Sequence, residues 1–257
     1  MHAESTLRDG RVRKRAAIRK SLTIGAVAAV AVLALGAVSG GMPILSAMSF
    51  LPSSQGGVRL ADFGDVSPSP EARHVADWVA DSRDNANADF IIVDKRDARV
   101  YVFDADARLR GSSPVLLGAA LGDDSVPGIG TRPIEDVRPE ERTTPAGRFV
   151  AERGRNLKGE DVVWVDYDAA VSMHRVRATK PAERRLERLA TPTIDDNRIS
   201  YGCINVPVAF YETYVSPTVA TQRAIVYVLP ELKPVQQVFN SYDVVATPRR
   251  LASLKLK

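Results

Sequence analysis

From residue 21 to residue 58 the chain contains no charged side chain. A helix needs about 20 apolar residues to cross a hydrocarbon core of about 30 Å, so residues 21–49 are long enough to span a membrane. Residues 1–20, directly before them, carry seven Arg or Lys and two acidic residues. Because positive charge stays on the cytoplasmic side, we expect a cytoplasmic segment 1–20, an inner-membrane anchor 21–49 and a periplasmic or otherwise extracytoplasmic remainder.

Two other interpretations of this segment remain open. A signal peptide that is cleaved at a small-residue site near residues 45–47 also places the rest of the chain outside the cytoplasm. A buried helix of a cytosolic protein would not. The length of the uncharged stretch favours the uncleaved anchor, because the apolar core of a signal peptide is only about 7–15 residues long.

The distribution of charge excludes one class of partner. The whole chain has a formal charge of +4, but residues 1–20 alone contribute +5, which leaves −1 for the remaining residues. A nearly neutral folded part does not provide the basic surface of a nucleic-acid-binding domain. The single cysteine also excludes an internal disulfide framework and a Cys-rich zinc module.

The pattern after the anchor predicts a mainly β domain with few short helices. Residues 50–87 comprise a Pro-, Ser- and Gly-rich linker and a short helix over 70–82, where Val75, Trp78 and Val79 recur at helical spacing. The domain itself is expected over 88–235, with a C-terminal tail over 236–257. Apolar and β-branched runs predict its strands, and the expected elements are strands at 90–93, 99–103, 114–121, 148–152, 162–165, 170–176, 199–206 and 224–229, with a helix at 207–215.

Two side chains are the candidates for covalent chemistry. Cys203 is the single thiol, and it follows Gly202 in the segment 199–206. A thiol becomes a good nucleophile near neutral pH when an imidazole takes its proton. Of the three histidines, His2 falls in the cytoplasmic segment and His74 on the helix 70–82, which leaves His174 as the imidazole partner.

These residues lie in a pattern that resembles a known family. Ser172-Met173-His174 followed by Ser200-Tyr201-Gly202-Cys203-Ile204-Asn205 resembles the active-site motif of the L,D-transpeptidases, the YkuD-type catalytic domain. The segment 143–149 (TTPAGRF) and the paired runs 90–93 and 99–103 resemble upstream segments of the same family. The resemblance covers about residues 88–230 and implies a β-sandwich or barrel of the L,D-transpeptidase type.

The resemblance also implies an activity and its site. The family forms a thioester between a cysteine and the third residue of a peptidoglycan stem peptide, and then transfers the acyl group to an amine, which gives a 3–3 crosslink. Carried over, Cys203 is the nucleophile and His174 the base. The turn Ser200, Tyr201 and Gly202, with the amides of Gly202 and Cys203, is expected to bind the oxyanion. Weaker candidates for substrate binding are Asn205, Arg148, Arg175 and Arg177. Neither the family nor the residue pattern calls for a metal or cofactor.

The sequence departs from the family pattern in two places. Tyr201 stands where the family usually has a second histidine, and tyrosine does not titrate near pH 7. The spacer from His174 to Ser200 is about ten residues longer than usual. It contains a predicted helix over 181–190 within a segment, 175–198, that carries a net charge of +3. This insert is either a solvated surface helix or a lid over the active-site cleft.

Several functions therefore remain compatible with the sequence. A hydrolytic or exchange variant would use the same residues. Tyr201 raises the possibility of a non-catalytic domain that only binds peptidoglycan, and an unrelated β-rich interaction protein with an inert thiol is a further alternative. The sequence does not predict the oligomeric state, the acceptor amine or the composition of the stem.

Overall fold

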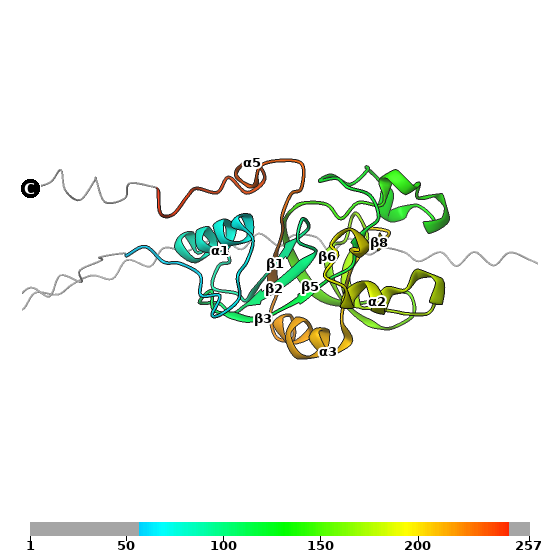
Figure 1. The fold of residues 1–257 in the computed structure, drawn as a ribbon, viewed down its shortest axis with the longest axis horizontal. Helices are drawn as coiled ribbons and strands as arrows, with labels where there is room; N and C mark the ends of the chain where they lie inside the picture. The colour runs from blue at the N-terminus through cyan, green and yellow to red at the C-terminus, as the bar shows by residue number, and fades with distance from the viewer. Residues whose placement is uncertain (1–56, 247–257) are drawn as a thin grey trace, which may run out of the picture. The chain divides into compact units, whose positions relative to one another are not determined.

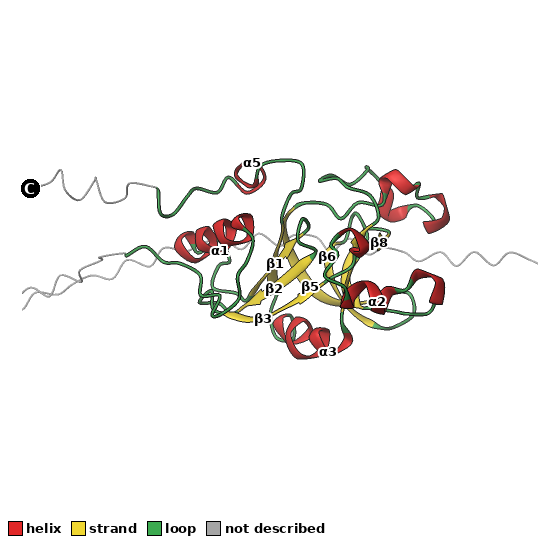
Figure 2. Cartoon of the chain, viewed as in Figure 1, coloured by secondary structure: helices red, strands yellow, loops and turns green. Residues whose placement is uncertain are grey.

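Residues 57–246 are described by a computed structural model, and they belong to one compact unit. The segments 1–20 and 21–49, for which a cytoplasmic tail and an anchor are predicted, lie outside the described residues. Within 57–246, no helix combines the length and apolar character that crossing a bilayer requires. The mainly β fold with few short helices that the sequence predicts is confirmed (Figures 1 and 2).

The described part of the chain alternates short strands with single helical turns. The strands are β1 (Phe90–Asp94), β2 (Arg99–Phe103), β3 (Leu109–Pro114), β4 (Leu117–Gly118), β5 (Gly147–Arg155), β6 (Asp161–Asp166), β7 (Val171–Arg175), β8 (Arg198–Ser200), β9 (Ile204–Val206) and β10 (Ala224–Val228). The α-helices are α1 (Pro70–Ser82), α2 (Arg185–Ala190), α3 (Val208–Phe210), α4 (Ser216–Thr218) and α5 (Val235–Phe239), with a π-helical segment at Tyr211–Val215. Short 3-10 turns occupy Ile129–Thr131, Ile134–Asp136, Pro139–Glu141, Pro181–Glu183 and Asp195–Asn197.

One sheet organises the domain. Its strand order is β3-β2-β1-β10-β5-β6-β7-β9; β1 pairs with β10 and β7 with β9 in parallel, whereas the other neighbours are antiparallel. Directly after β3, Leu116 exchanges two backbone hydrogen bonds of 2.9 Å with Asn205 in β9. The two edges of the sheet are thereby joined, and the sheet closes almost into a barrel. A second, two-stranded sheet pairs β4 with β8.

The two faces of the sheet support two apolar cores. In β1 successive side chains alternate, so Ile91 and Val93 face one core while Phe90 and Ile92 face the other. The first core lies on the side of α3 and the π-helical segment, and it includes residues of β7 and β9. The second lies under α1 and α5. Figure 1 shows α1 and α3 on opposite sides of the sheet.

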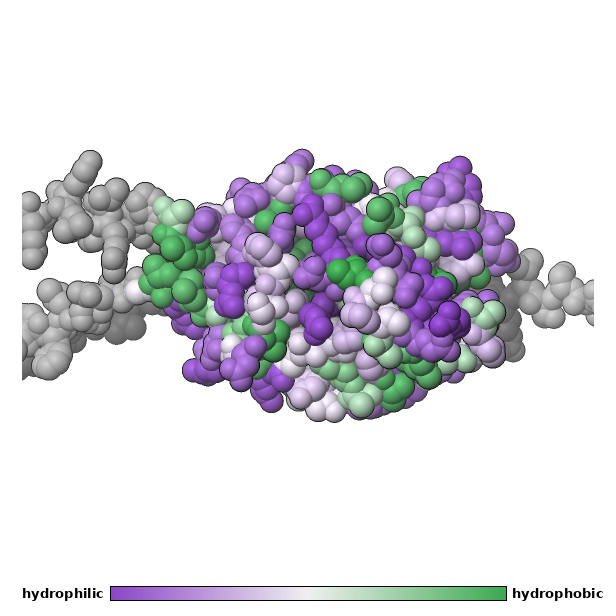
Figure 3. All heavy atoms as spheres, viewed as in Figure 1, coloured by the Kyte–Doolittle hydropathy of each residue, from purple (hydrophilic) through white to green (hydrophobic). Residues whose placement is uncertain are grey.

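The helix α1 has the predicted bounds and is integral to this packing. Ser69 caps it by accepting a hydrogen bond from the Ala72 amide, and Pro70 occupies the first turn. Val75 and Val79 are fully buried against the sheet. Residues 57–87, predicted as linker and helix, and the start of the predicted tail at 236–257 thus contribute to the second core. The exposed surface in Figure 3 mixes hydrophilic side chains with small hydrophobic patches.

Some predicted boundaries are wrong. The expected strand at 114–121 is instead the end of β3 and the short β4, because Val115 and Leu116 turn the chain toward β9. The expected strand at 199–206 is interrupted between β8 and β9, which belong to different sheets. The helix expected at 207–215 is present, but it changes from α to π geometry at Tyr211.

Candidate active site

The candidate nucleophile lies in a tight turn between β8 and β9. Gly202 has φ +126°, a conformation that L side chains rarely adopt. A Cβ atom at this position would lie 2.7 Å from the carbonyl oxygen of Thr143. Only glycine fits there, and its conformation ends β8 and turns the chain before Cys203. This local geometry is the physical reason why a single strand over 199–206 is impossible.

Thr144 holds this turn from beneath. Its side chain is fully buried; Oγ1 donates to the Gly202 carbonyl at 2.8 Å and accepts from the Gly118 amide at 2.9 Å. Gly118 is itself pressed against this segment, because a Cβ atom there would lie 2.3 Å from the Arg142 carbonyl. The segment 143–149, singled out by its resemblance to the family, therefore forms the floor of the turn.

Ser200 closes the turn from within and changes the expected oxyanion site. Its Oγ donates to the Cys203 carbonyl at 2.6 Å and accepts from the Gly202 amide at 3.1 Å. The Gly202 amide, predicted as an oxyanion donor, is therefore already engaged. The Cys203 amide donates to no acceptor among residues 57–246, so it is the backbone donor that remains available.

The Cys203 thiol is partly exposed and rests on the turn between β6 and β7. Sγ lies 3.6 Å from the Ala170 carbonyl oxygen and 3.7 Å from Ser172 Oγ. The sulfur therefore has two polar neighbours and is not fully buried. A partly exposed thiol with polar neighbours is accessible to a reagent or a substrate.

His174 lies on the neighbouring strand. Ser172 and His174 share one face of β7, as the alternation predicts, while Val171 and Met173 point into the first core. His174 Nδ1 is 2.8 Å from the carbonyl oxygen of Arg175. Because a carbonyl only accepts, Nδ1 carries the proton and Nε2 is left bare to accept one. Within residues 57–246, Cys203 and His174 form no hydrogen bond with each other.

The surroundings of His174 favour its neutral form. Burial of the imidazole, the largest cause, lowers its pKa below the ordinary 6.5, and the cations of Arg177 and Arg185 act in the same direction. The Arg175 carbonyl and Glu160 oppose them. A neutral imidazole at physiological pH has the protonation state that a general base needs.

The structure separates the other predicted site residues. Asn205 is buried in β9, where Nδ2 donates to the Cys203 carbonyl at 3.2 Å. Arg148 is bound to Asp84 at 2.5 Å, next to the buried ring of Tyr227. Arg175 is held by Asp161 and Glu212, on the face of β7 away from His174.

Arg177 forms an ion pair with Glu160 and acts electrostatically on His174. Of the three predicted arginines, it is the one whose charge lowers the pKa of His174. The carboxylate partners of Arg148 and Arg175 occupy the donors that a substrate carboxylate would need.

Tyr201 projects from the turn, and its ring stacks against the guanidinium of Arg142. Its side chain is 40% exposed, and the Arg142 guanidinium lies 4.1 Å from the centre of its ring. Two nitrogens of Arg142 also donate to the Val137 carbonyl. Stacking on an aromatic face suits the planar guanidinium. Sequence reasoning did not find Arg142, because nothing in its local pattern links it to residue 201.

The helix of the insert between β7 and β8 buries one residue against the domain, while Leu186 on it stays exposed. Leu189 of α2 is buried with Leu116 and Val176 on the outer face of the sheet. Arg185, the first residue of α2, donates to Asn205. The helix thus lies over the same face that carries Ser172 and His174. Arg185 was also missed from the sequence, where it is one cation among seven in the insert.

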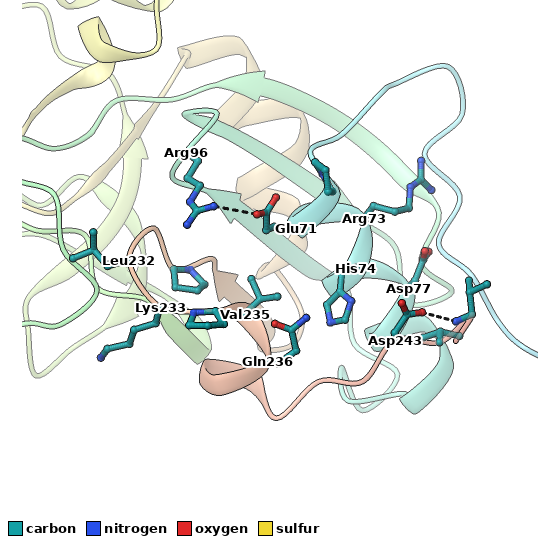
Figure 4. Close-up of a pocket in the computed structure, with 15 residues that line it drawn as sticks. Glu71, Arg73, His74, Asp77, Arg96, Leu232, Lys233, Val235, Gln236 and Asp243 are labelled. Atoms are coloured by element: carbon teal, nitrogen blue, oxygen red, sulfur yellow. Dashed lines mark hydrogen bonds and ion pairs between the residues drawn. The ribbon is translucent and has the colours of Figure 1, made fainter. Parts of the chain in front are cut away.

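Two cavities of the described part lie away from these residues. One of about 670 Å³ opens between α1 and the segment 230–245, and its lining includes His74, Asp77 and Lys233 (Figure 4). Another of about 430 Å³ is lined by Leu121, Ile194 and Leu232 among others. Neither is lined by Cys203 or His174. Within residues 57–246, no three side chains of the metal-binding types gather in one place. The partly exposed thiol and the motif around it, and not cavity volume, identify the candidate site.

The chain is similar in fold to several solved L,D-transpeptidase structures. The match to an Enterococcus faecium L,D-transpeptidase has 15% identity and a TM-score of 0.31, and it covers 55% of this chain and 50% of that one. For an L,D-transpeptidase from Mycobacterium smegmatis the values are 14%, 0.32, 55% and 58%. For the helical cell shape determining protein Pgp2 from Campylobacter jejuni they are 16%, 0.37, 61% and 55%. The match thus spans between half and three fifths of each of these chains. No family model matches this chain. No curated protein matches it either.

Proposed function

We propose that this protein is a cysteine acyltransferase of the L,D-transpeptidase type that acts on peptidoglycan stem peptides. The observation that carries the proposal is the pairing of β7 with β9, which places the accessible Cys203 thiol beside the face that presents His174. The motif around these residues, with its supporting Thr144, supplies the substrate class by resemblance.

The proposed reaction begins with a proton transfer. The Cys203 thiol gives its proton to His174 Nε2, and Sγ attacks the carbonyl carbon of the third residue of a tetrapeptide stem. For this step Sγ leaves the Ala170 carbonyl and approaches Nε2. The negative charge that develops on the substrate oxygen is stabilised by the Cys203 amide. One such donor typically lowers the activation barrier by about 3–4 kcal/mol.

The second half of the reaction reverses these roles. The bond between the third residue and the terminal D-Ala breaks, and His174 returns its proton to the departing amine, which leaves a thioester on Cys203. An amine from a second stem then attacks the thioester, His174 takes its proton, and the thiol is regenerated as the 3–3 crosslink forms. Water in place of the amine would give the hydrolytic variant of the same chemistry.

We further propose that residues 21–49 anchor the protein in the inner membrane, with the domain in the periplasm. An anchor there would keep the active site close to the membrane-proximal cell wall. Outside the cytoplasm free thiols tend to be oxidised. An unpaired, accessible cysteine in an exported domain therefore needs a reason, and a role as nucleophile provides one.

A second candidate is a non-catalytic domain that binds peptidoglycan. The observation in its favour is that the described residues show no hydrogen bond between Cys203 and His174. Catalytic hydrogen bonds are often loose in the absence of substrate, so this geometry does not decide between the two functions.

Intact-protein mass spectrometry with a disaccharide-tetrapeptide tests the proposal. The wild type is expected to gain the mass of the donor less D-Ala and to release free D-Ala, whereas Cys203→Ala does neither. Products from a mixture with a second stem then separate crosslinking from hydrolysis. Release of no D-Ala, together with undiminished binding by Cys203→Ala, would instead support the non-catalytic domain.

A further inference from the structure

The insert helix α2 reaches the active-site strands through Arg185. Its Nη1 donates to Asn205 Oδ1 at 2.6 Å, and its Nε donates to Glu183 Oε2 at 2.5 Å. The side chain is only 14% exposed. Fixing a long side chain in this way costs conformational entropy, so both hydrogen bonds must offset that loss.

Asn205 extends the contact to the nucleophile. Its side chain is 1% exposed, and Nδ2 donates to the Cys203 carbonyl at 3.2 Å. Its backbone is fixed by the two hydrogen bonds to Leu116, and it is the register partner of His174 across β7 and β9. Arg185 therefore touches the residue that adjoins both members of the candidate pair.

The charges that face His174 come from three places. Arg177 follows β7, Arg185 begins α2, and Glu160 precedes β6; the first two act against protonation of the imidazole and Glu160 favours it. Arg177 is itself ion-paired with Glu160, and Arg185 with Glu183. Because the imidazole is buried, these charges are screened less than they would be in water.

We propose that Arg185 is a positioning residue, which fixes the Cys203 turn through its hydrogen bond to Asn205. This inference rests on the proposed function only in taking Cys203 and His174 as the reacting pair. It gives the insert a chemical role: the insert brings a cation to the active site that the motif itself does not contain.

A purely structural role for Arg185 is separable from this one. Arg188 holds the insert together internally, because it donates to the carbonyls of Glu183 and Asp196. Leu189 anchors it through apolar packing. Arg184, its neighbour, is 68% exposed and pairs with Glu187, so Arg184→Gln removes the same charge from the same helix without touching Asn205.

The experiment compares Arg185→Gln, Arg185→Lys and Arg184→Gln in the full chain. The protonation of His174 is followed by NMR as a function of pH, and alkylation of Cys203 by iodoacetamide gives the reactivity of the thiol. Melting temperatures show whether each variant is folded. Iodoacetamide is neutral, so a change in its rate does not arise from attraction of the reagent to the arginine.

Arg185→Gln is expected to slow alkylation at pH 7 by roughly threefold to tenfold, and removal of its charge moves the His174 titration toward higher pH. Arg185→Lys keeps the charge but not the hydrogen bonds of the guanidinium, so the titration stays near that of the wild type while alkylation slows. Arg184→Gln is expected to change neither quantity.

Equal behaviour of Arg185→Gln and Arg184→Gln would overturn the proposal. So would a loss of melting temperature in Arg185→Gln without slower alkylation of Cys203, since that result marks a structural anchor. The proposed function fails in a different way: Cys203 alkylation would then be insensitive to His174→Ala in the otherwise unchanged chain.

Discussion

Replacing Thr144 by valine tests whether the floor of the turn determines the reactivity of Cys203. The substitution keeps the shape of the side chain and removes its hydroxyl. The Gly118 amide then loses its acceptor and the Gly202 carbonyl loses its donor, both in a fully buried environment. Each buried polar group without a partner destabilises a protein by about 1–3 kcal/mol, so the two groups together should cost about 2–6 kcal/mol.

Thermal unfolding and thiol alkylation measure the two consequences. For a domain of this size the loss corresponds to a decrease in melting temperature of roughly 5–15 °C. Alkylation of Cys203 should become slower, because the turn is no longer fixed at Gly202. Thr144→Ser retains the hydroxyl and should restore most of both properties.

The neighbouring Thr143 provides a matched control. Its hydroxyl donates to the Asp124 carbonyl in an exposed position, so Thr143→Val should destabilise the protein by less than about 1 kcal/mol. If Thr144→Val melts at the temperature of the wild type, or no lower than Thr143→Val, the argument that this hydroxyl supports the turn is wrong.

Three further predictions follow from the site and its surroundings. The rate of Cys203 alkylation by iodoacetamide should fall at low pH with a midpoint below pH 6.5, because burial is the largest cause that holds the pKa of His174 beneath that value. A midpoint above 6.5 would contradict this. His174→Ala should slow the reaction far more than Tyr201→Phe, which preserves the ring under Arg142, and equal rates would refute the assigned roles. Asp123→Asn should lower the free energy of unfolding by about 3 kcal/mol, because it leaves the fully buried Lys95 ammonium with Glu231, 3.5 Å away, as its remaining carboxylate, and an unchanged denaturation midpoint would contradict that.

The same Asp123 gives an acid-stability prediction. Burial alone raises the pKa of this carboxyl, but hydrogen bonds from the Glu231 amide, Lys95 and the amides of Lys233 and Leu232 lower it to about 2. Its folded pKa is therefore below the unfolded value of 3.8. The stabilisation is complete above pH 3.8 and is lost as the pH falls toward 2. Urea unfolding at pH 5 and pH 2.5 should show this loss in the wild type and a smaller one in Asp123→Asn.

Local patterns were sufficient for the elements with clear periodicity. Ser69, Pro70 and the apolar spacing of α1 fix that helix, and the runs 90–93 and 99–103 give β1 and β2. The motif also identified the turn that carries Cys203. These features are local, so neighbouring residues contain the information that determines them.

Features set by contacts between distant segments were not visible in the sequence. Lys95 lies in the turn between β1 and β2, where a charged side chain is usually exposed, yet it is fully buried because Asp123 and Glu231 approach it from two other segments. The interruption at Gly202 follows from the Thr143 carbonyl, which lies far away in the chain. The role of Arg185 likewise depends on the packing of α2 against β9, which no spacing rule predicts.

The most direct test of the account is the mass of the intact protein after incubation with a carbapenem, which acylates nucleophilic cysteines of this type. The account predicts a stable adduct on the wild type, its absence in Cys203→Ala, and slow formation in His174→Ala. An unmodified wild-type protein, or an adduct that persists in Cys203→Ala, would contradict the assignment of Cys203 as the nucleophile.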